Sequence, residues 1–191
     1  MSEKIPPIVL LDANVLYSLY LRDFLLFLAT YMLYQPKWSD KINEEWTRSL
    51  LSKRKDLSPD KILGVVKNMI IFFRRANVSD YSELVDDLTL PDPDDRHVLA
   101  AAIKAKAAII TTANLRDFPQ EYIQQFDIEI LHPDAFVMRL LESMPQKCLL
   151  AFRAQVAKVR NPVLTEEEIL AALEKSGLTE SVKKLRILIE D

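Results

Sequence analysis

Near its start the chain reads Ile8-Val9-Leu10-Leu11-Asp12-Ala13-Asn14-Val15-Leu16-Tyr17. The β-branched and aliphatic run over 8–11 predicts a short buried strand, which ends on Asp12. Ligands of open α/β sheets bind outside the carboxyl ends of the strands. Asp12 is therefore a candidate functional residue, and the simpler alternative is that it only caps the helix that follows it.

The next hundred or so residues repeat this alternation of strand and helix. Aliphatic runs predict two more short buried strands, over 108–111 and 128–131. Strands that alternate with helices favour an α/β fold. We therefore expect a three-layer α/β/α sandwich with a central, mostly parallel sheet.

Capping residues and prolines mark the predicted helices. A helix over 40–54 follows an N-cap serine, and Asp92-Pro93 opens a helix that runs to about residue 106. A helix is also expected over 14–34, with a break near 22–23 where two charged residues interrupt the apolar run. Gln35-Pro36-Lys37 is expected to be a connection between elements.

The end of the chain has a different organisation, because no strand is predicted after residue 145. Thr165 and Glu168 form a capping box at the start of one helix, and Thr179 is a candidate cap for a last helix. The sequence therefore predicts two units, an α/β domain over 1–145 and an all-α C-terminal extension over 146–191.

Composition bounds the class of protein. The chain has 191 residues, 49% of them hydrophobic, which suffices for a core without disulfides, and Cys148 is its single cysteine. Two glycines leave no glycine-rich phosphate loop. A net charge of −3 argues against a surface coated with positive charge for nonspecific nucleic-acid binding.

Targeting and membrane signals are not expected. Residues 1–17 lack the basic segment, apolar run and cleavage site of a signal peptide. The longest apolar run, 24–34, is shorter than the roughly 20 residues that span a bilayer. It is expected to be a core helix or, alternatively, a helix that docks a partner. A cytoplasmic protein without membrane association is the expectation.

Asp95 is predicted to lie on the inward face of its helix. Its neighbours one and two helical turns onward are all apolar: Val98, Leu99, Ala102 and Ile103. A charged group on such a face must be paired or bind a metal, because isolated burial is costly. The alternative is a first-turn acid stabilised by the helix dipole. Asp92 is expected to be the cap, and His97 a surface residue or a residue behind the acids rather than a general base.

Helical periodicity also distinguishes Glu45 from Glu44. Ile42, Trp46 and Leu50 mark the buried face of their helix. Glu45 flanks this row, whereas Glu44 falls on the opposite side. Glu45 is therefore a candidate site residue, with a salt-bridged residue at the edge of the core as the alternative.

A group of polar residues follows the strand predicted over 108–111. Thr112, Asn114 and Asp117 lie just beyond its carboxyl end, in the position that Asp12 occupies after the first strand. Parallel strands would bring both groups to one edge of the sheet. The alternative is a turn, which Asn and Asp favour through local hydrogen bonds.

Four carboxylates could thus converge: Asp12, Glu45, Asp95 and Asp117. Like charges this close repel each other unless a cation neutralises them, and oxygen-only ligands favour Mg²⁺ or Mn²⁺. Such a cluster suits phosphodiester hydrolysis, in which metal ions activate a water and stabilise the attacking and leaving oxygens.

The sequence resembles the PIN-domain ribonucleases, especially the VapC-like toxins of toxin–antitoxin pairs. The resemblance covers about residues 8–140, and the tail resembles the helical extension of one branch of the family. The matching segments are Leu11 to Tyr17, Trp38-Ser39 with Glu45, Pro91 to Ala102, Thr111 to Phe118 and, in the tail, Arg160-Asn161-Pro162 and Leu164-Thr165.

The resemblance implies a PIN-like fold and a Mg²⁺- or Mn²⁺-dependent endoribonuclease site. Two sets of residues match family positions: the acids Asp12, Glu45, Asp95 and Asp117, and their neighbours Asn14, Thr112 and Asn114, which orient the acids or touch the substrate. It also implies an RNA substrate, a small antitoxin partner and a homodimer. Two alternatives are a catalytically silent PIN-fold scaffold and a structure-specific DNA nuclease.

Positive charge for RNA contact is available in three short clusters. An acidic cleft repels RNA unless metal ions and nearby cations offset its charge. The clusters are Lys53-Arg54-Lys55, Arg74-Arg75, and Arg153 with Lys158 and Arg160. Each could contact phosphate, although such a cluster is more often a solvated surface.

Overall fold

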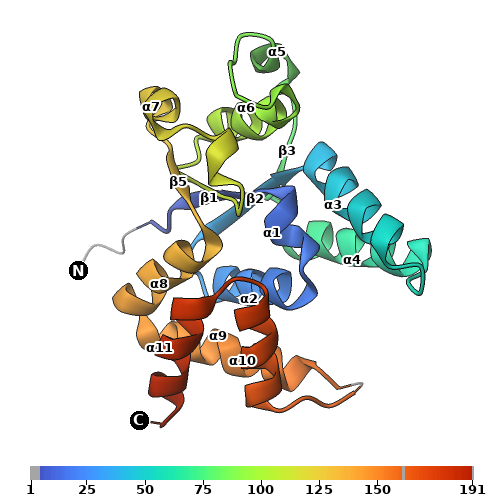
Figure 1. Ribbon diagram of the computed structural model, residues 1–191, viewed down its shortest axis with the longest axis vertical. Coiled ribbons are helices and arrows are strands. Elements are labelled where there is room, and N and C mark those ends of the chain that lie inside the picture. Colours follow the sequence, from blue (N-terminus) through green and yellow to red (C-terminus); the bar gives the residue numbers. More distant parts are fainter. Residues whose placement is uncertain (1–4, 161, 191) are drawn as a thin grey trace.

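The computed structural model describes residues 5–160 and 162–190, so Asn161 of the tail motif lies outside the described residues. Its centre is a five-stranded parallel sheet in the order β3-β2-β1-β4-β5 (Figure 1). The strands are β1 (Ile8–Leu11), β2 (Gln35–Ser39), β3 (Asn77–Val78), β4 (Ile109–Thr111) and β5 (Glu129–Leu131).

Helices cover both faces of this sheet, which confirms the predicted α/β/α sandwich. Helix α6 packs on β1, β2, β3 and β4, whereas α2 and the extension lie on the other side of the sheet (Figure 1). The α-helices are α1 (Ala13–Tyr17), α2 (Leu19–Thr30), α3 (Asp40–Lys53), α4 (Pro59–Phe72), α5 (Ser82–Val85), α6 (Arg96–Ala105), α7 (Gln120–Ile123), α8 (Pro133–Ser143), α9 (Pro145–Lys158), α10 (Glu166–Lys175) and α11 (Thr179–Glu190). Short 3-10 turns are η1 (Pro93–Asp95), η2 (Leu115–Asp117) and η3 (Gln124–Phe126).

The prediction of a connection at Gln35-Pro36-Lys37 is wrong, because these residues form most of β2. Proline lacks the N–H that a central strand needs on both sides. Here β3 pairs only with the last two residues of β2, Trp38 and Ser39. At Pro36 the strand is therefore an edge strand on that side, and the missing donor costs no ladder hydrogen bond.

The expected helix over 14–34 breaks at Ser18 rather than near 22–23. Arg22 stays inside α2 although it is 2% exposed. Its Nη1 donates to the carbonyl of Leu16 over 2.7 Å, and its guanidinium lies 4.6 Å from the ring centroid of Trp46. These two contacts hold the guanidinium within the core, although its Nε makes no hydrogen bond with the described residues. Phe24, also in α2, is fully buried, which places the apolar run in the core.

The extension is helical and packs on α2. Phe152 of α9 meets Phe24 edge to face, with ring centroids 6.2 Å apart. Gln155 donates to the carbonyl of Tyr20 over 2.8 Å. Within the described part of 146–191, β pairing is limited to one isolated bridge between Arg160 and Val163. No helix of the described residues is long and apolar enough to cross a membrane.

The cap of the last helix comes from a residue distant in sequence. Thr179 is the first residue of α11, not its cap as expected. The carboxylate of Asp134 in α8 accepts from the backbone N–H of Glu180 and of Ser181, over 2.9 and 2.8 Å, and from the Ser181 hydroxyl over 2.6 Å. Asp134 therefore ties α11 to α8.

Replacing Asp134 with Ala should destabilise the protein. Asp134→Ala leaves helix-terminal N–H groups without their acceptor, so we expect the free energy of unfolding to fall by about 1–3 kcal/mol in urea denaturation. Glu142→Ala, an exposed acid of the same helix, is the control and should change it by less than about 0.5 kcal/mol. Equal losses in both variants would contradict the role of Asp134.

Candidate active site

The carboxyl ends of β1 and β4 bring Asp12 and Thr112 together. The backbone N–H of Asp12 donates to the Thr111 carbonyl over 3.1 Å, so both strands end at the same level. The Thr112 hydroxyl then donates to Oδ2 of Asp12 over 2.7 Å, and the Ala13 N–H donates to Oδ1 over 2.6 Å. Asp12 is 4% exposed, and its carboxylate is fixed by these contacts.

Asn14 completes this network from the first turn of α1. Its Nδ2 donates to Oδ2 of Asp12 over 2.5 Å and to the Thr112 hydroxyl over 2.9 Å. Its Oδ1 accepts from the Ala113 N–H over 2.9 Å. The Thr112 hydroxyl also accepts from the Asn114 N–H over 3.0 Å. The side chain of Asn14 therefore joins α1 to the loop after β4.

A second group of acids lies at the start of α6 and in η2. Carboxylate oxygens of Asp92, Asp95 and Asp117 all lie within 4.8 Å of one another. Asn114 orients Asp117, because its Nδ2 donates to Oδ2 of that residue. Asp92 also accepts from the Asp94 N–H over 2.9 Å, as a cap would. The sequence prediction gave Asp92 this capping role alone and missed its place beside Asp95, although three acids in four residues were a signal for it.

The acids of this edge interact electrostatically. Partial burial first, and then the charges of Asp12, Asp92, Asp117 and Glu45, raise the pKa of Asp95 from 3.8 to about 7. Burial also raises the pKa of Asp12, although hydrogen bonds from Thr112 and Ala13 oppose the shift, and the charge of Glu45 adds to it. The charges of the other three predicted acids therefore act on Asp95, and that of Glu45 also acts on Asp12.

Glu45 reaches this edge from α3 and contacts His97 of α6. Nε2 of His97 lies 2.9 Å from Oε1 of Glu45. The prediction of a salt-bridged residue at the core edge and that of a site residue both fit Glu45, whose side chain is 25% exposed. His97 is 2% exposed, so its expected place on the surface is wrong and its place behind the acids is correct. The first turn of α6, which follows Asp95, carries the imidazole of His97 inward.

The donor set fits a hard divalent cation. Three carboxylate groups within 4.8 Å of one another supply only oxygen ligands, which Mg²⁺ and Mn²⁺ prefer. Burial and then the neighbouring negative charges raise the pKa of Asp95, and such an ion would neutralise that charge. Asp92, Asp95 and Asp117 could hold it; the charges of Asp12 and Glu45 also act on Asp95, although neither belongs to the group within 4.8 Å.

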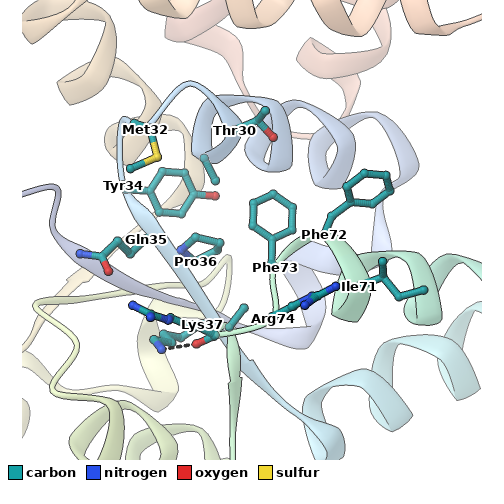
Figure 2. A pocket seen from close by; sticks show the side chains of 13 residues that line it. Thr30, Met32, Tyr34, Gln35, Pro36, Lys37, Ile71, Phe72, Phe73 and Arg74 are labelled. Atoms are coloured by element: carbon teal, nitrogen blue, oxygen red, sulfur yellow. Dashed lines mark hydrogen bonds between the residues drawn. The ribbon is translucent and has the colours of Figure 1, made fainter.

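A large hollow of the surface lies away from the acids, at the amino edge of the sheet. This groove of about 500 Å³ lies between the segment that precedes β2 and the one that precedes β3 (Figure 2). Phe72, which is 80% exposed, and the cations Lys37, Arg74 and Arg75 line it. Arg74-Arg75 therefore lies at the opposite edge from Asp12. Of the other basic clusters, Arg54 pairs with Asp56 and Lys158 with Asp23.

Comparisons with known proteins agree with this geometry. A family model described as "PIN domain" matches residues 8–116, and one described as "VapC50 C-terminal domain" matches residues 133–187. The chain is 35% identical over 79 residues to the curated protein "Putative ribonuclease VapC50" of Mycobacterium tuberculosis (strain ATCC 25618 / H37Rv). The matched part is 41% of this chain and 47% of the relative, so the chain spans about half of the relative's length. No solved structure matches the chain.

The raised pKa of Asp95 predicts how stability depends on pH. The folded group keeps its proton up to about pH 7, whereas the unfolded group releases it near 3.8, so stability falls as pH rises through this window. Without divalent ions, Asp95→Asn should therefore stabilise the protein above about pH 7 by about 1 kcal/mol after solvent screening, or about 2–4 °C in Tm, and have little effect near about pH 4.

Thermal unfolding in a metal chelator at both pH values measures this difference. Asp94→Asn is the matched control, because Asp94 is an exposed neighbour outside the carboxylate cluster. A Tm gain for Asp95→Asn that is the same at both pH values would show that charge crowding is not its cause.

Proposed function

The chain belongs to the PIN-domain family, and from this membership we propose that it is a metal-dependent endoribonuclease, the toxin of a toxin–antitoxin pair. The observation that carries the proposal is the carboxylate cluster at the carboxyl edge of the sheet, where Asp92, Asp95 and Asp117 approach within 4.8 Å. The similarity to a relative named a ribonuclease supports the same assignment.

The catalytic residues in this proposal are Asp12, Glu45, Asp95 and Asp117. Mg²⁺ or Mn²⁺ bound there would supply a Lewis acid that lowers the pKa of a water and offsets charge on the phosphate. The chain's own residues hold the acids in place beforehand. Asn14 and Thr112 fix the carboxylate of Asp12, and Asn114 orients Asp117.

The substrate in this proposal is RNA, whose phosphates need positive charge near the acids. Arg116 is exposed in η2, directly beside Asp117, and no carboxylate of residues 5–160 or 162–190 pairs with it. Sequence analysis missed this cation because it stands alone rather than in a cluster. We propose that Arg116 contacts a phosphate of the bound strand.

Partners, location and domain division follow from the same proposal. We expect a small antitoxin protein that neutralises the site, a homodimer, and a cytoplasmic location where RNA is available. The single thiol, Cys148, is buried and suits a reducing compartment. The division into a nuclease domain over 1–145 and a helical extension over 146–191 is part of the proposal, although the C-terminal family match already begins at residue 133.

Two other functions make different predictions. A silent PIN-fold scaffold would bind no divalent ion at the acids, whereas Asp12, Glu45, Asp95 and Asp117 are all present here. A structure-specific DNA nuclease would cleave DNA in preference to RNA. Matched single-stranded RNA and DNA oligonucleotides, assayed with Mg²⁺ or Mn²⁺, distinguish these possibilities from an endoribonuclease.

Neutralising one acid of the site should abolish RNA cleavage. Asp12→Asn, Asp95→Asn and Glu45→Gln each keep the shape of the side chain and remove a charge, so we expect cleavage rates to fall at least about 100-fold. Glu44→Gln is the control, because Glu44 is the exposed neighbour of Glu45. Cleavage that survives in purified Asp12→Asn and Asp95→Asn would refute the proposed nuclease site.

Removing a cation at one edge of the sheet should affect RNA binding differently from removing a cation at the other edge. Arg116→Ala should raise KM for a short RNA by about 3–10-fold and reduce its salt dependence, because a phosphate contact is lost. Arg74→Ala removes a cation at the opposite edge and should leave KM for the same RNA unchanged. Steady-state kinetics at two salt concentrations test this, and equal effects would contradict a contact specific to Arg116.

A further inference from the structure

We propose that His97 is a positioning residue for Glu45, and that it orders this carboxylate for a divalent cation bound at the acids. The proposal rests on the nuclease function inferred above and adds a residue to its site. Nε2 of His97 lies 2.9 Å from Oε1 of Glu45, a close polar contact although the ring N–H is not aligned with that oxygen as in a hydrogen bond. The other carboxylate oxygen, Oε2, receives no hydrogen bond from the described residues and stays available as a ligand.

The contact joins two elements that approach the site from different parts of the fold. Glu45 belongs to α3, which follows β2, and His97 belongs to the first turn of α6, two residues after Asp95. Asp95, the N-cap of α6, therefore lies in the cluster while His97, in the first turn of α6, contacts Glu45. A displacement of α6 would move both Asp95 and Glu45, because Asp95 directly precedes α6 in the chain and Glu45 contacts His97.

Glu45 is the polar partner that the ring has. Both ring nitrogens of His97 are buried, and within the part of the chain that the structure describes neither makes an aligned hydrogen bond, although Oε1 of Glu45 lies 2.9 Å from Nε2. Burying an imidazole without aligned hydrogen bonds costs free energy that an apolar side chain would avoid. The surrounding α6 residues Val98 and Leu99 are fully buried, so an apolar residue would suit this place. A histidine here is explained by its contact with Glu45.

Ordering Glu45 before the ion binds should raise the affinity of the site for that ion. A free glutamate loses rotamer freedom when it is fixed, and the ion would otherwise bear that cost on binding. Hydrogen-bond partners behind metal ligands typically contribute about 10–100-fold to metal affinity. His97 touches Glu45 rather than the substrate, so its effect should reach the reaction through the ion.

Two amide substitutions form a matched pair that tests the contact. In His97→Gln the amide nitrogen can take the place of Nε2 and reach Glu45, whereas in His97→Asn the shorter side chain falls short of it. Both bury an amide, so both lose comparable stability. Mn²⁺ affinity of the full chain, measured by titration calorimetry, should fall about 10–100-fold in His97→Asn and stay within about threefold of the wild type in His97→Gln.

A double-substitution cycle separates positioning from packing. If His97 acts through Glu45, then His97→Asn should weaken Mn²⁺ binding no further in a Glu45→Gln background. Equal losses of Mn²⁺ affinity in His97→Gln and His97→Asn would overturn the proposal. An undiminished effect of His97→Asn in the Glu45→Gln background would also overturn it. Wild-type protein that binds Mn²⁺ and does not cleave RNA would refute the nuclease function and leave the role of His97 standing. Wild-type protein that binds no Mn²⁺ would refute both.

Discussion

A hydrogen bond between the Thr112 hydroxyl and the Asp12 carboxylate joins the ends of β1 and β4, and the site depends on it. The two strands are adjacent and parallel, so their carboxyl ends lie side by side without any help from the loops. The bond places one carboxylate at the sheet's edge with little freedom. The other acids arrive on α3, η1 and η2, and the charge of Asp12, fixed by the sheet, acts on Asp95.

Mutual repulsion is the cost of this arrangement. Asp95 has a pKa of about 7 because burial and four neighbouring acids disfavour its charge, so the cluster weakens the folded state at neutral pH. The hydrogen bonds from Asn14, Thr112 and Asn114 hold the acids together against that repulsion. A cation bound at this site would offset the repulsion among the acids and so stabilise the folded state.

Sequence patterns placed Asp12, Glu45 and Asp95 within single elements and missed the contacts between elements. Asp12 was predicted from the end of a strand, and Glu45 and Asp95 from the apolar spacing around them; their role as site residues stays a prediction. The strand at Pro36 was missed because its tolerance of proline depends on how far β3 extends along β2. The pairing of His97 with Glu45 and the capping of α11 by Asp134 join residues distant in the chain, and local patterns carry no information on such contacts.

Side chains of opposite charge gather at the two edges of the sheet. Asp12, Asp92, Asp95 and Asp117 lie at the carboxyl edge, whereas Lys37, Arg74 and Arg75 line the groove at the amino edge. A long-range field of this form exerts a torque on a charged molecule before any contact is made. In the absence of divalent ions, an approaching polyanion would be turned toward the amino edge, so occupancy of the acidic edge by cations also determines which side of the protein the polyanion meets.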